Sequence, residues 1–186
     1  VSVFDSNATA VSSATVLIDN TGSAATTQSF IGTTGVNNFT GGDGNDSFDF
    51  STAASFQDID AIDGSGGTDT ITVSYAGTAA LKPELENVEV VILTNTGANS
   101  TTLTINAVDT ASGYDHITNL ASSGAITINN LQSLPSLVKM NSAGDDFTLD
   151  LEEAALAGTS DNLNVTISGT DTTTVPTLTN FILNIY

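Results

Sequence analysis

The sequence contains no cysteine and no tryptophan, and it carries almost no positive charge. The absence of cysteine excludes a disulfide scaffold and every thiolate metal site. Only Lys82 and Lys139 oppose 21 acidic residues, which gives a formal net charge of -19. Nucleic acid is not expected as a partner, because phosphate binding requires clustered Lys and Arg, and anionic membranes are disfavoured for the same reason. Because so much like charge opposes compaction, the composition favours multivalent cations as partners.

Long apolar stretches are lacking as well. No run of about 18 apolar residues is present, so no membrane span is expected. No positively charged leader with an apolar segment follows Val1, so the sequence shows no secretory signal peptide. Because there is no initiating Met and the sequence ends in mid-pattern at FILNIY, we expect a fragment of a longer chain, with any export signal outside it.

Short strand-forming segments dominate the chain. They are rich in β-branched residues and are separated by clusters of Gly, Asn, Asp, Ser and Thr, which close turns. The predicted strands cover residues 15–19, 47–51, 69–75, 88–94, 101–108, 125–128, 146–151, 162–168 and 180–186. Helical periodicity is nearly absent, and the best helical candidates are 78–88, with one short turn around Pro83, and 151–157. The sequence therefore predicts an all-β protein.

A nonapeptide unit recurs in the first half of the chain. GTTGVNNFT (32–40), GGDGNDSFD (41–49) and GSGGTDTIT (64–72) share glycines at the first and fourth positions and a large apolar residue at the eighth. The second copy matches G-G-x-G-x-D-x-U-x throughout, where U is a large apolar residue. The third copy lacks only the second glycine, and the first has Asn37 where the frame has Asp. A repeated unit of this kind favours a solenoid over a β-sandwich.

The residue types of this unit suit a cation-binding turn. Glycines permit a tight turn with positive φ and let backbone carbonyls crowd around one point. Asp46 adds a carboxylate, and the following strand points Phe48 inward; Phe39 and Phe50 are expected in the core as well. Stacked turns would then enclose a hard cation in an all-oxygen cage, which is the coordination that Ca²⁺ prefers.

On these residues the sequence resembles the RTX, or hemolysin-type, calcium-binding repeats. The resemblance implies a right-handed parallel β-solenoid (β-helix or β-roll) in which one nonapeptide forms half a coil and Ca²⁺ binds between turns on one edge. The step from Gly41 to Gly64 is longer than two nonapeptides, so the intervening half-coil must contain an insertion, and Asp58, Asp60 and Asp63 lie in it. The metal-binding residues implied by the resemblance are Gly41, Gly42, Asp43, Gly44, Asp46, Asp60, Asp63, Gly64, Gly66 and Asp69.

A second stretch extends the resemblance. FDFSTAASFQDIDAIDGSGGTDTITVSYA followed by LENVEVVILTNTG is similar to segments of RTX-type bacterial surface-layer (S-layer) proteins, which are exported by type I secretion. The implied organisation is an uncertain β segment over 1–30, calcium-binding repeats over 31–76, and a Thr- and Asn-rich solenoid continuation over 77–186. The implied localisation is secreted, at the bacterial cell surface.

Catalysis is not expected from this sequence. Adjacent acids such as Asp145–Asp146 and Glu152–Glu153 point to opposite faces of a strand, which does not suit a catalytic pair. His116 is the only histidine, and we expect it in a loop.

The sequence is compatible with three functions. The first is a structural segment that self-assembles into a lattice or filament, with cell-surface polysaccharide as a further partner. The others are an adhesin module that binds a glycan or protein, and an accessory calcium-binding module of a secreted hydrolase. If the first holds, Asp58, Asp60, Asp63, Asp145 and Asp146 are the expected intermolecular calcium ligands.

Overall fold

The chain folds into parallel β-sheets with almost no helix. A computed structural model describes residues 25–98, 100–107, 114–141, 144–157, 159, 161–168 and 180–186. The predicted strand at 15–19 lies outside the described residues. The elements are β1 Ser29–Ile31, β2 Asn38–Thr40, β3 Ser47–Phe50, β4 Ala61–Asp63, β5 Thr70–Tyr75, β6 Ala79–Leu81, β7 Glu84–Glu86, β8 Val90–Asn95, β9 Thr102–Asn106, β10 His116–Leu120, β11 Ala125–Leu131, β12 Leu137–Asn141, β13 Phe147–Leu151, the 3-10 helix η1 Glu153–Leu156, β14 Asn164–Ser168 and β15 Phe181–Ile185.

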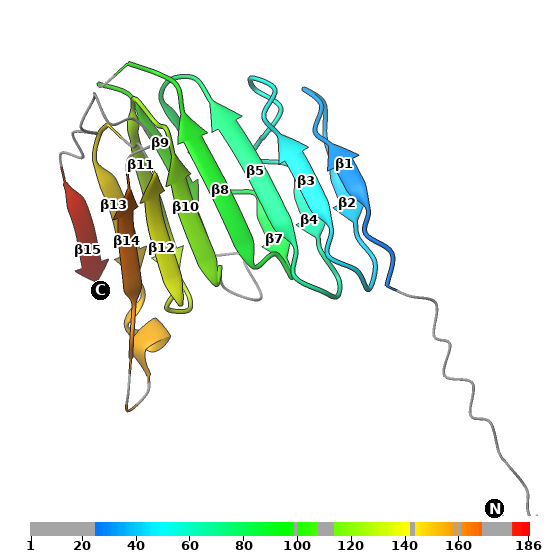
Figure 1. Ribbon diagram of the computed structural model, residues 1–186. Helices are drawn as coiled ribbons and strands as arrows, with labels where there is room; N and C mark the ends of the chain where they lie inside the picture. The colour runs from blue at the N-terminus through cyan, green and yellow to red at the C-terminus, as the bar shows by residue number, and fades with distance from the viewer. Residues whose placement is uncertain are drawn as a thin grey trace, which may run out of the picture.

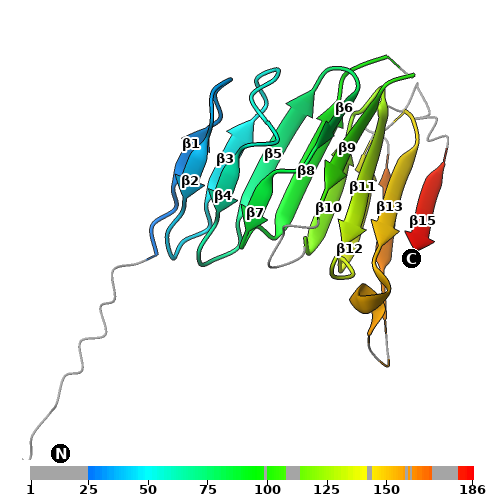
Figure 2. The ribbon, with the colours of Figure 1, turned by 180° about the vertical axis from the view of Figure 1, so that it is seen from behind.

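These strands form two opposed faces of one solenoid. One face is a seven-stranded sheet in the order β1-β3-β5-β8-β10-β12-β14, and the other consists of the sheets β2-β4-β7 and β6-β9-β11-β13-β15. In Figure 1 the strands of the seven-stranded sheet point up in front while the chain advances from right to left, and the view from behind in Figure 2 shows the opposite face running down. This arrangement is a right-handed parallel β-solenoid, as predicted.

The core is a set of apolar columns that run along the coil axis. Strands alternate between inward and outward side chains, and parallel pairing in register places equivalent inward residues above one another. One such column on the seven-stranded sheet is Phe48, Ile71, Val91, Ile117 and Val138. All five are at most 2% exposed.

Aromatic stacking begins the core at the amino-terminal side. The rings of Phe30 and Phe48 lie 5.0 Å apart at an interplanar angle of 9°, and Phe39 lies 5.1 Å from Phe30. Phe48 and Phe50 are fully buried and Phe39 packs against the core. The prediction that Phe39, Phe48 and Phe50 are core or stacking residues is therefore confirmed.

The length of a coil varies along the solenoid. Ser29 pairs with Ser47 and Ser47 pairs with Thr70, so the second coil is longer than the first. A later coil of the same sheet, from Leu137 to its partner Asn164, is longer still. The additional residues of the second coil lie in the long connection over 51–60, between β3 and β4, at the edge of the coil. This is the insertion that the spacing of the nonapeptides requires.

The helical prediction for 78–88 is wrong. The segment forms two short strands, β6 and β7, separated by Lys82 and the buried Pro83. β6 pairs with β9 in the coil that follows, and β7 pairs with β4 in the coil that precedes. The other helical candidate, 151–157, contains the short 3-10 helix η1. No helix among the described residues is long and apolar enough to cross a membrane.

Candidate cation-binding turns

Two of the predicted turns stack on one edge of the solenoid. Turn 41–46 joins β2 to β3, and turn 64–69 joins β4 to β5 in the next coil. The N–H of Gly41 donates to the carbonyl of Asp63 at 2.8 Å, and the N–H of Gly66 donates to the carbonyl of Gly42 at 2.9 Å. The structure therefore brings together the two turns that the inserted stretch separates in the sequence.

Glycine is required where oxygen atoms crowd between these turns. A Cβ at Gly41 would lie 2.3 Å from Asp46 Oδ2 and 2.5 Å from the carbonyl oxygen of Gly64. A Cβ at Gly64 would lie 2.5 Å from Asp69 Oδ2 and 2.0 Å from the carbonyl oxygen of Asn87. Carboxylate and carbonyl oxygens of successive coils thus border spaces that only a glycine leaves open.

The acidic residues of this edge form a ladder of hydrogen bonds between coils. Asp46 Oδ1 accepts from the N–H of Gln28 at 2.6 Å, Asp69 Oδ1 accepts from the N–H of Asp46 at 2.6 Å, and Glu89 Oε2 accepts from the N–H of Asp69 at 2.8 Å. Each acid directly precedes a strand of the seven-stranded sheet and satisfies a backbone donor of the previous coil. Glu89 was not among the residues predicted from the sequence, although its position at the start of a predicted strand, as for Asp69, could have indicated it.

Asp69 differs from Asp46 in having an unsatisfied oxygen. Asp46 Oδ2 accepts from the N–H of Gly42 at 2.6 Å, whereas Asp69 Oδ2 is buried without a hydrogen-bond partner. Burial is the largest of the effects that raise the pKa of Asp69, and the nearby carboxylates of Glu89, Asp46 and Asp63 raise the pKa further. The hydrogen bond from Asp46 opposes this rise without cancelling it. A positive charge beside Asp69 would remove the cost of its ionised form.

The other predicted ligands lie around this edge or away from it. Asp43 is exposed on turn 41–46, and Asp63 ends β4, where its Oδ1 accepts from Asn87 Nδ2 at 2.8 Å and from the N–H of Ser65 at 2.9 Å. Asp60 lies at the opposite edge, in the connection from β3 to β4, and Asp58 in the same connection accepts a hydrogen bond from the N–H of Lys82.

The acidic residues outside these turns are placed as follows. Asp146 precedes β13, and its Oδ1 accepts from Asn180 Nδ2 at 2.9 Å. Asp145 Oδ1 accepts from the N–H of Asp146 at 2.8 Å. His116 is the first residue of β10, rather than a loop residue, and its Nε2 lies 3.5 Å from Asp115 Oδ2.

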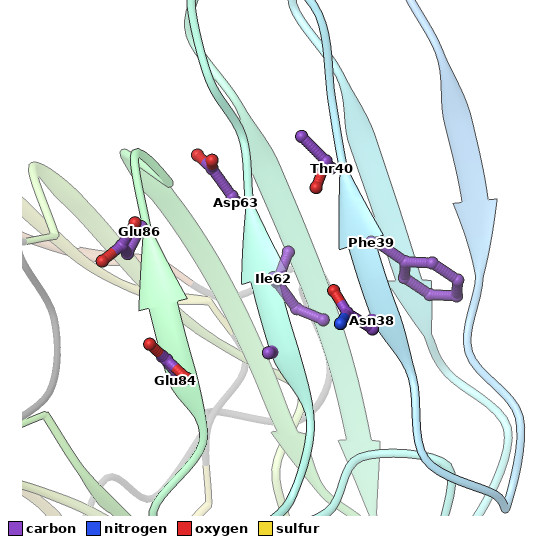
Figure 3. A pocket seen from close by; sticks show the side chains of 8 residues that line it. Asn38, Phe39, Thr40, Ile62, Asp63, Glu84 and Glu86 are labelled. Carbon is purple, nitrogen blue, oxygen red and sulfur yellow. The ribbon is translucent and has the colours of Figure 1, made fainter.

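A shallow hollow marks the outer face of the sheet β2-β4-β7. Figure 3 shows Thr40, Asp63 and Glu86 on neighbouring strands, with Glu84 below Glu86 on β7. The strand register places Thr40 opposite Asp63 and Asp63 opposite Glu86. Three carboxylates therefore line a solvent-facing hollow next to the end of β4.

Within the described part of the chain, no three His, Cys, Asp or Glu side chains lie close enough together to form a metal site by themselves. The stacked turns offer a different donor set, in which one carboxylate per turn is joined by backbone carbonyls. The fold and these turns define the chain as a parallel β-solenoid with glycine- and aspartate-rich edge turns. Comparison with models of protein families, with curated proteins and with solved structures found no match.

Proposed function

We propose that this chain is a calcium-binding structural segment of a secreted bacterial surface protein, and that copies of it assemble into a surface layer or fibre. The observation that carries the proposal is the pair of stacked turns in which the buried Asp69 Oδ2 has no hydrogen-bond partner. The side chains and carbonyls that border these turns offer oxygen, and hard cations such as Ca²⁺ prefer carboxylate and carbonyl oxygens. Asp46 and Asp69 would supply the carboxylates, and the carbonyls of Gly64 and Asn87 border the same spaces.

Calcium at this edge would stabilise the fold in two ways. It would compensate the carboxylate of Asp69, and it would reduce the self-repulsion of a chain with a formal net charge of -19. A ligand that binds only the folded state increases stability by mass action. The free energy of calcium binding therefore contributes directly to the free energy of unfolding.

Exposed apolar residues lie on the last described coil, where a further coil could pack. Val165 and Ile167 of β14 are 41% and 60% exposed, although they pair in register with the buried Val138 and Met140 of β12. On the opposite face, Leu183 of β15 is 42% exposed while its partner on β13 is buried. These side chains continue the inward columns of the core, and a further coil, from a longer chain or from a second copy, would bury them.

Divalent cations would also allow two copies of the chain to pack side by side. The charged side chains that line the hollow, Asp63, Glu84 and Glu86, are all acidic, so two such faces repel one another. Divalent cations that bridge carboxylates of two chains would convert this repulsion into a specific contact, whereas monovalent salt would only screen it.

The proposal is tested by thermal unfolding and light scattering in excess chelator and in millimolar CaCl₂, with MgCl₂ as the comparison ion. We expect calcium to raise the unfolding midpoint and, at higher concentration, to drive assembly that electron microscopy shows as sheets or filaments. Asp46→Ala should reduce the calcium-induced shift of the midpoint, and the exposed Asp161→Ala should preserve it. Equal midpoints in chelator and calcium would refute calcium binding. A calcium-stabilised protein that stays monomeric at high concentration would refute self-assembly and favour the adhesin module.

A further inference from the structure

The turn at residues 32–37 has the same construction as turn 41–46, but it lies at the opposite edge and has an amide in place of the carboxylate. Asn37 Oδ1 accepts from the N–H of Thr33 at 2.9 Å, just as Asp46 Oδ2 accepts from the N–H of Gly42. The N–H of Asn37 donates to Asp60 Oδ1 at 2.9 Å, as the N–H of Asp46 donates to Asp69 Oδ1. Asn37 with Asp60 at one edge is therefore the counterpart of Asp46 with Asp69 at the other.

Four oxygen atoms from the two stacked connections converge on the Asn37 amide nitrogen. Nδ2 lies 3.0 Å from the carbonyl oxygen of Thr33, 2.9 Å from that of Gly35, 3.2 Å from that of Ser55 and 3.0 Å from Asp60 Oδ1. An amide nitrogen has two hydrogens, so four acceptors exceed what it can satisfy fully. Asn37 is 3% exposed, so water does not make up the difference from an open surface.

The two edges differ in how well their carboxylates are satisfied. At the amide-containing edge, Asp60 Oδ1 accepts from both nitrogens of Asn37, and Asp60 Oδ2 accepts from the N–H of Gln57 at 2.8 Å. At the carboxylate-containing edge, Asp69 Oδ2 has no partner. The side-chain amide thus provides for Asp60 the compensation that Asp69 lacks.

We infer that the Asn37 amide occupies the position of a cation between stacked turns, and that Asn37→Asp would turn this edge into a second divalent-cation site. The chemical class of the ligand, a hard divalent cation such as Ca²⁺, rests on the proposed function. The arrangement of oxygen atoms around Nδ2 is observed in the structure and does not depend on that proposal. In the natural chain both carboxylate oxygens of Asp60 are satisfied without metal, which restricts any calcium requirement of the stacked turns to the edge formed by 41–46 and 64–69.

Without calcium, Asn37→Asp places a carboxylate oxygen among four other oxygens and removes the donor group at their centre. The variant should then unfold at a lower temperature than the wild type in chelator. With calcium, two carboxylates and three carbonyls surround a cation of suitable radius, and the midpoint should recover. Asn37→Ala removes the amide without adding charge, so its midpoint should fall by a similar amount in chelator and in calcium.

The experiment measures unfolding midpoints of the full chain in EGTA and in CaCl₂, together with the calcium stoichiometry by titration calorimetry. We expect Asn37→Asp to bind one more Ca²⁺ per chain than the wild type and to show a larger calcium-induced shift than either the wild type or Asn37→Ala. An unchanged stoichiometry and shift would overturn the inference, as would an Asn37→Asp chain that stays unfolded in calcium. The wild-type response tests the proposed function separately, because the inference depends only on the difference between variant and wild type.

Discussion

Substitution of Asp69 by Asn separates the cost of its charge from its value as a metal ligand. The side chain is fully buried, and Oδ1 accepts the N–H of Asp46 at 2.6 Å, a bond that an Asn oxygen would keep. The second oxygen, which has no partner, would become an amide nitrogen beside the carbonyl of Asn87, since both border the space that a Cβ at Gly64 would fill. Removing an unsatisfied buried acceptor recovers roughly 1–3 kcal/mol.

This gain should appear only in the absence of divalent cations. A stabilisation of about 2 kcal/mol raises the unfolding midpoint of a chain of this size by about 4–8 °C, so in EGTA Asp69→Asn should unfold above the wild type. In millimolar calcium the order should reverse, because the variant lacks a carboxylate ligand. Circular dichroism at increasing temperature measures both midpoints.

Asp43→Asn is the matched control, because it removes the same charge from an exposed residue of the neighbouring turn. Its effect in EGTA should stay within about 0.5 kcal/mol. If Asp69→Asn is no more stable than the wild type in EGTA, or gains no more than Asp43→Asn, the assignment of an uncompensated charge to Asp69 is wrong.

Three further outcomes are expected. Gly64→Ala should destabilise the chain by more than about 2 kcal/mol in chemical denaturation, because its Cβ would lie 2.0 Å from the carbonyl oxygen of Asn87, whereas Gly35→Ala, with its nearest contact at 3.8 Å, should have little effect. Asn119→Leu should raise the unfolding midpoint in thermal scans, because both polar side-chain atoms of Asn119 are buried without hydrogen-bond partners, and leaving them unsatisfied costs roughly 1–3 kcal/mol. An unchanged or lower midpoint would contradict this expectation. The pKa of Asp69 is higher in the folded than in the unfolded chain, so ionisation of Asp69 destabilises the metal-free fold at pH values above the unfolded pKa. This loss of stability becomes smaller as the pH falls through the folded pKa. The stability difference between wild type and Asp69→Asn in calcium-free buffer should therefore narrow on acidification, and a constant difference between neutral pH and pH about 4 would contradict this reasoning.

The sequence predicted the parts of the fold that depend on local pattern. Glycines and Asp46 specify a turn, and the apolar position two residues later specifies an inward side chain, so Phe48 and Ile71 are placed correctly from the nonapeptide alone. The stacking of turns 41–46 and 64–69 followed as well, because an insertion at the opposite edge does not alter which edge the next turn occupies.

The features that the sequence did not predict depend on contacts between distant residues. Residues 78–88 contain alanine and leucine at spacings that fit a helix, and only pairing with β9 and β4 fixes the segment as two strands. Asp60 lies within the inserted stretch, and its distance from Asp46 in sequence does not reveal that half a coil separates the two. The oxygen atoms around the Asn37 amide come partly from Ser55, whose position depends on the path of a connection longer than the repeat.

The division of one face between two sheets gives the solenoid unequal mechanical sides. The seven-stranded sheet is continuous from β1 to β14, whereas on the other face β7 ends one sheet and β6 begins the next, with no strand pairing between them among the described residues (Figure 2). Bending that opens the divided face at this joint separates side chains but breaks no strand ladder, whereas bending that opens the seven-stranded face must stretch the hydrogen bonds between its strands. A rod built in this way has a preferred direction of flexure, and the joint that permits this flexure lies at the coil that contains Pro83.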